Sequence, residues 1–216
     1  MAEPPRTLTG FLNHERSEPY GRMGVVSDPV YLVRHGQSEW NVLRLTQGQT
    51  PHPPLTDLGR EQAAAAAYRI KADLGGASIA RVVSSDLSRA AETAAIVADL
   101  IGGEITPDVR LREQDLGDLE GKSYEETWAA AEAHDWSDPA LPVAGGESLL
   151  DVRARMAAVL EETVDAAGPV VLVSHGDAIR VGLTAVTGVM PHEAEWVDVP
   201  NGAVARVDGT TISWLG

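Results

Sequence analysis

Short, valine-rich apolar runs recur along the chain, each bounded by polar residues. The runs at residues 30–33, 82–83 and 170–173 are continuous rather than alternating, which predicts short strands buried on both faces. Another short strand is predicted at 105–109. The tail at 203–216 predicts a pair of strands joined by a tight turn. None of these runs approaches the length of about 18 residues that a membrane-spanning helix needs.

Longer stretches between these runs carry apolar residues at helical spacing. Two predicted helices lie at 57–74 and 88–101, the first directly after Thr56, whose hydroxyl suits an N-cap. A further helical stretch surrounds Trp128, and residues 147–168 form the longest predicted helix. Helices therefore separate most of the predicted strands.

This alternation of strands and helices predicts an α/β fold. We expect a three-layer sandwich with a mostly parallel central sheet and helices on both faces. Residues 29–216 form one predicted domain, and residues 1–28 an N-terminal extension. The proline, glycine and polar content of the extension predicts a mobile or loosely attached segment, the alternative being that it packs beside the ligand-binding edge of the sheet.

Two of the predicted strands end in a histidine that a glycine follows. Residues 34–36 read Arg-His-Gly after the first run, and 174–176 read Ser-His-Gly after the last, while Arg89 lies shortly after the second run. One such histidine is more often a structural group than a catalyst. Because parallel strands place their carboxyl ends at one edge, where α/β proteins bind ligands, we expect these side chains to lie together.

Two histidines and two arginines at one sheet edge suit the transfer of a phosphoryl group. The guanidinium fork matches phosphate oxygens, and a neutral imidazole is a nucleophile that can form a covalent intermediate. Arginines and a second imidazole can stabilise the charge on the equatorial oxygens without a metal ion. An acid for the leaving oxygen is still required.

Charge and composition narrow the range of partners. The 216 residues include 17 basic and 32 acidic side chains, for a net charge of −15. This excess of acid argues against general binding to nucleic acid or to anionic membranes, and favours a small phosphorylated metabolite as partner. The sequence leaves a homodimer open.

The absence of cysteine removes thiol chemistry and disulfides, and the first residues lack the apolar core of a signal peptide, so we expect a cytoplasmic protein. The six histidines show no metal-binding spacing. We therefore expect neither a metal site nor a cofactor.

Four separated motifs resemble one family. They read LVRHGQSEWN, SSDLSRAAETA, LREQDLGDLEG and VLVSHGDAIR, in that order, and are similar to those of the histidine phosphatase superfamily, in the branch that contains cofactor-dependent phosphoglycerate mutases. The resemblance implies the phosphoglycerate mutase-like sandwich. It also implies that His35 becomes phosphorylated, that Arg34 and Arg89 hold the phosphoryl group, that His175 hydrogen-bonds it, and that Glu113 is the general acid and then the base.

The proposed chemistry sets conditions on these residues. His35 must be neutral at its attacking nitrogen, with the other nitrogen donating to a backbone carbonyl, and Glu113 must be desolvated enough for a raised pKa. Further predicted contacts to the substrate come from polar groups near the two histidines: Ser38, Asn41, Gln47, Gly48 and Gly176.

Within the family, the sequence favours hydrolysis. A mutase must bind a second acidic group, yet residues 126–146 contain no lysine or arginine, and Gln114 follows the predicted acid where mutases tend to have arginine. We therefore predict a metal-independent phosphomonoesterase of the histidine acid phosphatase type. The alternatives are a cofactor-dependent phosphoglycerate mutase and a phosphate-binding module without turnover.

Overall fold

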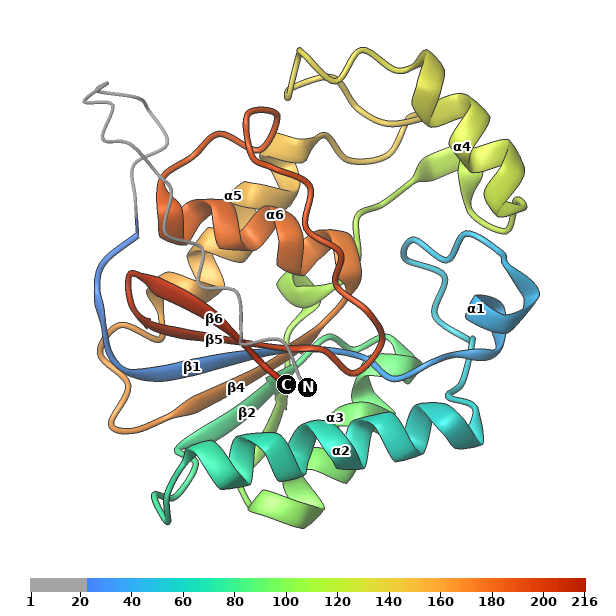
Figure 1. The fold of residues 1–216 in the computed structure, drawn as a ribbon. Coiled ribbons are helices and arrows are strands. Elements are labelled where there is room, and N and C mark those ends of the chain that lie inside the picture. The colour runs from blue at the N-terminus through green and yellow to red at the C-terminus, as the bar shows by residue number, and fades with distance from the viewer. Residues whose placement is uncertain (1–22) are drawn as a thin grey trace, which may run out of the picture.

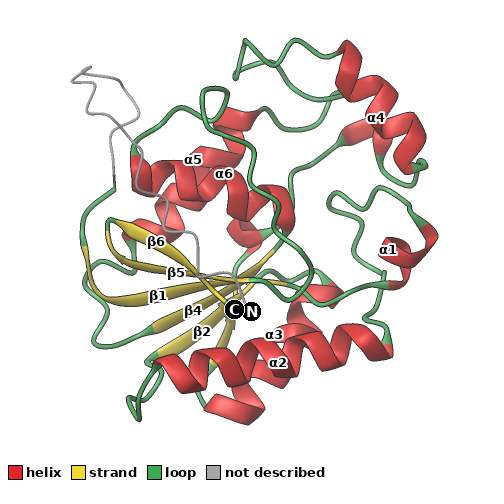
Figure 2. Ribbon diagram, viewed as in Figure 1, coloured by secondary structure: helices red, strands yellow, loops and turns green. Residues whose placement is uncertain are grey.

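The computed structural model describes residues 23–216, which form a six-stranded sheet with helices on both faces (Figures 1 and 2). The strand order is β3-β2-β4-β1-β5-β6; β3, β2, β4 and β1 run parallel, and β5 and β6 are antiparallel to their neighbours. The predicted α/β fold with a mostly parallel sheet is confirmed. The strands are β1 (Val26–Arg34), β2 (Arg81–Ser84), β3 (Ile105–Pro107), β4 (Val170–Ser174), β5 (Val204–Gly209) and β6 (Thr211–Leu215).

Helices cover the sheet in two pairs. The helices are α1 (Glu39–Leu43), α2 (Asp57–Asp73), α3 (Ser88–Ile101), α4 (Tyr124–Ala133), α5 (Leu149–Glu161) and α6 (Gly176–Thr187), with 3-10 helices at Val109–Leu111 and Gly117–Leu119. One hydrophobic cluster joins α5 and α6 to one face of the sheet, and a second joins α2 and α3 to the other face. In Figure 1, α4 stands apart from both layers.

The centre of the sheet explains why the two histidines meet. β1 and β4 are parallel neighbours, with Val30 paired to Val170 and Arg34 paired to Ser174. Residues 30–33 and 170–173 alternate between the two clusters on opposite faces of the sheet, so both of these stretches are apolar throughout. The paired strand ends therefore deliver His35 and His175 side by side.

The first strand begins earlier than the sequence predicts. β1 begins at Val26, and Met23 is buried and donates its backbone N–H to the carbonyl of Ala185 at 3.2 Å, so the boundary after residue 28 falls inside a strand. A bulge follows Val26 in its pairing with β5, and the polar residues there concealed the strand in the sequence. Residues 1–22 of the predicted extension lie outside the described residues.

The predicted longest helix is also not the longest one described. α5 has 13 residues against 17 in α2, because the chain leaves the helix after Glu161 and the hydroxyl of Thr163 donates to the carbonyl of Leu160 at 2.6 Å. Among residues 23–216, no helix combines the length and apolar content needed to cross a bilayer.

Candidate active site

A cavity of about 280 Å³ opens at the carboxyl ends of the parallel strands. His35, after β1, and His175, after β4, lie with their ring centroids 5.1 Å apart. The residues from the sequence motifs that line the cavity include Arg34, His35, Arg89, Glu113 and Gly176. The structure thus brings together residues from all four motifs.

The ring of His35 is held in one tautomer. Its Nδ1 lies 2.7 Å from the carbonyl oxygen of Gly36, which can only accept a hydrogen bond, so Nδ1 carries the proton and Nε2 is free of one. Burial, followed by the positive charges of Arg89 and Arg34, holds the pKa of His35 well below 6.5. At neutral pH the imidazole is therefore an uncharged nucleophile, as the sequence analysis required.

The backbone at Gly36 is fixed by close packing. A Cβ added there would lie 2.0 Å from the carbonyl oxygen of Gly59 on α2, so any side chain would displace the loop. The N–H of Gly36 also donates to the hydroxyl of Thr93 on α3 at 3.2 Å. The loop that carries the nucleophile is thus anchored to both helices of this face.

Two arginines reach the cavity with part of each guanidinium group unpaired. Arg89, which is fully buried, donates to the carbonyls of Gly48 at 2.8 Å and Thr50 at 2.9 Å, and Arg34 donates to the carbonyl of Val199. Within the described residues, the Nε atoms of both arginines are buried and have no hydrogen-bond partner. Buried donors without partners are costly, so this arrangement fits an anionic ligand. Burial lowers the pKa of Arg89 to about 10, which still leaves it charged at neutral pH.

His175, after β4, is fully buried next to the ring of His35 and is not among the residues that line the cavity. Its Nε2 lies 2.9 Å from the hydroxyl of Ser85, which in turn accepts the backbone N–H of Leu87 at 3.3 Å. Its Nδ1 is buried and unpaired among the described groups. Burial, with Arg89 as the next cause, holds the pKa of His175 well below 6.5.

Glu113 lies partly buried against the N-terminus of α6. Its carboxyl group accepts the backbone N–H groups of Gln114 and Ala178, both at 2.9 Å, and that of Asp177 at 3.3 Å. Burial raises the pKa of Glu113, and the nearby charge of Asp177 raises it further, against the lowering effect of these hydrogen bonds and of Arg34. The expected desolvated carboxyl with a raised pKa is therefore present.

Arg155 on α5 holds the segment that carries Glu113, a role that the sequence did not suggest. Its guanidinium group donates to three backbone carbonyls, those of Arg110 at 2.7 Å, Arg112 at 2.5 Å and Glu113 at 2.9 Å. It also pairs with Glu147 at 2.8 Å. No local sequence signal marks these contacts, because they join distant segments.

The predicted loop residues divide into two groups. Asn41, Gln47 and Gly48 line the cavity. Ser38 does not: its hydroxyl accepts the N–H of Asn41 at 3.3 Å, as the N-cap of α1, and donates to Gln47 at 2.7 Å. The polar sequence of the loop indicated a binding residue, whereas the geometry of Ser38 is that of a support for two residues that face the cavity.

The outer part of the cavity comes from residues that the sequence analysis did not select. α4 contributes Tyr124, Thr127 and Trp128, and the loop between α6 and β5 contributes Trp196 and Asp198. A helix was predicted around Trp128, but nothing in the sequence indicated that it faces this loop.

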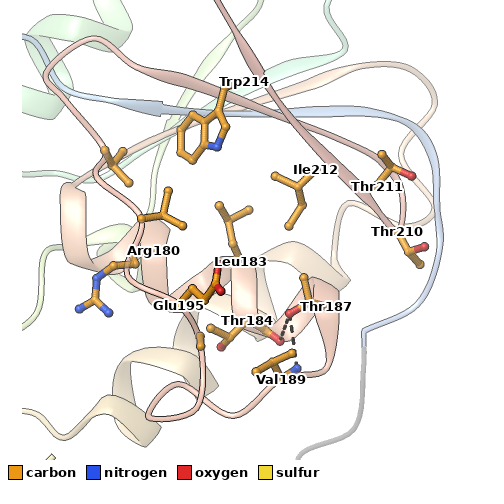
Figure 3. Close-up of a pocket in the computed structure, with 13 residues that line it drawn as sticks. Arg180, Leu183, Thr184, Thr187, Val189, Glu195, Thr210, Thr211, Ile212 and Trp214 are labelled. Carbon is orange, nitrogen blue, oxygen red and sulfur yellow. Dashed lines mark hydrogen bonds between the residues drawn. The ribbon is translucent and has the colours of Figure 1, made fainter. Parts of the chain in front are cut away.

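A second cavity, of about 190 Å³, lies between α6, the α6–β5 loop and the β5–β6 hairpin (Figure 3). Its lining is mainly apolar and includes Leu183, Ile212 and Trp214, with threonines at the rim. None of the described residues that line it is a histidine. The nucleophile and the paired arginines belong to the first cavity.

The structure is that of an α/β protein with two histidines at one edge of its sheet, and comparison with known proteins identifies the family. The model of the histidine phosphatase superfamily (branch 1) matches residues 30–214, and this chain belongs to that family. Curated relatives named probable phosphoglycerate mutase GpmB are similar to it. The protein from Proteus mirabilis is 37% identical over 195 residues, covering 86% of this chain and 87% of the relative, and that from Photorhabdus laumondii is 36% identical over 194 residues, with the same coverage.

Solved structures of the family share the fold. A mycobacterial glucosyl-3-phosphoglycerate phosphatase in complex with VO3 superposes with a TM-score of 0.72 at 32% identity, covering 87% of this chain and 96% of that one. The YhfR protein of Bacillus stearothermophilus gives a TM-score of 0.72 at 32% identity, covering 86% of this chain and 94% of that one. The relatives thus include both proteins named as mutases and a protein named as a phosphatase.

Proposed function

We propose that this protein is a phosphomonoesterase that hydrolyses a small phosphorylated metabolite through a phosphohistidine at His35. One observation carries the proposal: the unprotonated Nε2 of His35 shares a cavity with two cationic guanidinium groups and with Glu113, a partly buried carboxyl group of raised pKa. A nucleophile, two phosphate clamps and an acid are the groups that such a transfer requires.

In the first step, Nε2 of His35 attacks phosphorus and the ester P–O bond breaks. Arg34 and Arg89 neutralise the equatorial oxygens. In the tautomer of His175 that carries its proton on Nδ1, the Ser85 hydroxyl donates to Nε2 and the Nδ1–H group donates a hydrogen bond to the phosphoryl group, keeping its proton. Glu113 gives its proton to the departing oxygen, so the alcohol leaves uncharged.

In the second step, water attacks the phosphohistidine. Glu113, now a carboxylate, takes a proton from the water as the new P–O bond forms and the P–N bond breaks. Inorganic phosphate leaves, and His35 and the protonated Glu113 are restored. No metal ion enters either step, and three His, Cys, Asp or Glu side chains do not converge on a common point anywhere in residues 23–216.

The test is turnover of p-nitrophenyl phosphate by the wild type and by His35→Ala, with and without chelator, together with rapid quenching at neutral pH after mixing with labelled substrate. We expect full activity in chelator, no activity in the variant, and label on His35 of the wild type. Loss of activity in chelator, or an active variant, would overturn the proposed mechanism. Tight phosphate binding by a wild type that turns over no ester would instead support a binding module.

Mutase activity is the second candidate, because curated relatives of 36–37% identity carry that name. Against it, the described residues 126–146 bring no cation to the cavity. Gln114, which follows the acid, is buried and donates to the carbonyl of Glu147 at 2.9 Å instead of facing the cavity. Incubation with 3-phosphoglycerate and 2,3-bisphosphoglycerate separates the two functions: isomerisation faster than phosphate release would establish the mutase.

A further inference from the structure

Two exposed tryptophans border the opening of the active-site cavity. Trp128 on α4 is 54% exposed and Trp196 in the α6–β5 loop is 73% exposed, and both line the cavity that contains His35. Single exposed apolar side chains are common on protein surfaces. Two large indoles on the lining of one catalytic cavity form a surface that can cover the part of a substrate beyond its phosphate.

The charges around this opening nearly cancel. Apart from Arg34 and Arg89, the lining has one cation, Arg180, and it pairs with Asp177 at 2.9 Å. Asp198 adds a further negative charge. A second anionic group on the substrate would therefore find no unpaired cation in this part of the lining and would meet two carboxylates.

A cationic group is disfavoured for a different reason. The guanidinium carbon of Arg180 lies 4.2 Å from the ring centroid of Trp196, and that of Arg44 lies 5.1 Å from the ring centroid of Trp128. The protein's own cations thus already make the cation–π contacts that these rings offer. A cationic substrate would have to compete with both arginines.

We propose that this opening binds an uncharged alcohol that presents a ring to the two indoles, so that the substrate is the phosphate ester of an aryl-bearing or glycosyl-type alcohol. The hydroxyl groups of Thr127 and Tyr124 on the same lining suit an uncharged polar ring. The cavity volume of about 280 Å³ limits the substrate to a small molecule. This inference rests on the proposed phosphatase function and adds the class of leaving group.

The test compares kcat/KM for esters whose leaving groups are chemically similar. Ethyl phosphate lacks a ring, benzyl phosphate adds one, 4-carboxybenzyl phosphate adds a negative charge to it, and phosphocholine carries a positive charge. Glucose 6-phosphate presents a sugar ring on a primary alcohol. We expect benzyl phosphate, glucose 6-phosphate or both to exceed ethyl phosphate at least fivefold, and the carboxylate of 4-carboxybenzyl phosphate to lower kcat/KM at least tenfold relative to benzyl phosphate; the better of the two rings distinguishes an aryl from a glycosyl group.

Variants of the two tryptophans test whether their indoles cause the preference for ring esters. Trp128→Ala and Trp196→Ala should each lower kcat/KM for the preferred ring ester about two- to tenfold, as expected for the loss of one ring contact, and change that for ethyl phosphate less than twofold. Trp136→Ala is the matched control, because Trp136 is exposed but does not line the cavity. Thermal melting checks that each variant is folded.

Equal turnover of ethyl and ring esters would overturn this inference while leaving the phosphatase function standing. Undiminished turnover of 4-carboxybenzyl phosphate, faster turnover of phosphocholine, or tryptophan variants that behave like the control would do the same. Failure to hydrolyse any ester, ethyl phosphate included, would count against the proposed function itself.

Discussion

At the scale of single residues, His35 and Glu113 require opposite protonation states for the same reaction. Burial acts on both, and in opposite directions, because it disfavours the charged form: it lowers the pKa of the imidazole and raises that of the carboxyl group. One buried environment thus keeps the nucleophile free of a proton and the acid supplied with one.

This predicts the pH dependence of kcat/KM for an alkyl phosphate. Activity should fall as pH rises through the raised pKa of Glu113, since the acid then loses its proton, and the acid limb of His35 should lie below pH 6.5. Glu113→Gln removes the proton donor, so kcat/KM for ethyl phosphate should fall about 10²- to 10⁴-fold. For p-nitrophenyl phosphate the loss should be far smaller, because nitrophenolate leaves without a proton; equal losses for both esters would exclude Glu113 as the general acid.

Gly36 gives a second prediction at this scale. In Gly36→Ala the new methyl group would overlap the carbonyl of Gly59, and the loop must shift by more than its surroundings allow. We expect kcat to fall at least tenfold, because His35 is displaced from in-line attack, and the midpoint of thermal unfolding to drop by several degrees. Gly76→Asn is the control: Gly76 has no neighbouring atom within 4 Å of an added Cβ, and asparagine tolerates its positive φ better than most residues.

At the scale of elements, the acid is positioned by a helix that does not touch the substrate cavity. Arg155 on α5 donates to the backbone carbonyls of three residues in the segment 110–113, and its charge is balanced by Glu147. The N–H donors of lysine all lie on one nitrogen atom, so lysine cannot reach the three carbonyls that two nitrogen atoms of Arg155 contact. Arg155 is therefore a positioning residue.

Arg155→Lys should lower kcat for ethyl phosphate about tenfold with a smaller change in KM, because the acid is misplaced while the phosphate clamps remain. Its effect on kcat/KM for p-nitrophenyl phosphate should be slight, because kcat/KM reports the phosphorylation step and nitrophenolate leaves without a proton; a purely structural loss would lower kcat/KM for both esters. Steady-state kinetics on both esters, with Arg81→Lys on β2 as the control, check this prediction. Parallel losses for the two esters would show that Arg155 acts on the fold rather than on Glu113.

The elements also show what the sequence could reveal. The strands β1 and β4 and the histidines after them were predictable, because continuous valine runs and parallel pairing are local signals with a fixed geometric result. The start of β1 was not, because a bulge interrupts its pattern. Arg155 and Trp196 were missed for a related reason. Their roles come from contacts between segments far apart in the chain, and no local sequence pattern indicates such contacts. Ser38 was assigned to binding because a loop hydroxyl looks the same in sequence whether it caps a helix or faces a ligand.

At the scale of the whole molecule, a strongly acidic protein carries a small cationic site. The net charge is −15, yet the inner cavity presents Arg34 and Arg89, each with a buried unpaired Nε among the described residues. Binding of an anion there supplies the missing partners in the folded state only. Ligand binding should therefore raise the free energy of unfolding.

Inorganic phosphate at 100 times its dissociation constant should raise the free energy of unfolding by about 2.7 kcal/mol. Arg34→Gln should lose most of this stabilisation, whereas Arg60→Gln, which alters a surface pair on α2, should retain it. Thermal melts across a phosphate series, with potassium chloride matched for ionic strength, measure the effect. Stabilisation that chloride reproduces would place the anion elsewhere than between the two arginines.

The placement of α4 outside the two helical layers has an evolutionary consequence (Figure 1). His35 follows a central strand that is packed on both faces, so its position tolerates little change, whereas α4 has no residue in either hydrophobic cluster and can be replaced with little disturbance of them. A lineage can then retain its chemistry while exchanging the alcohol that it recognises. Grafting α4 from a relative of different preference should move that preference with it.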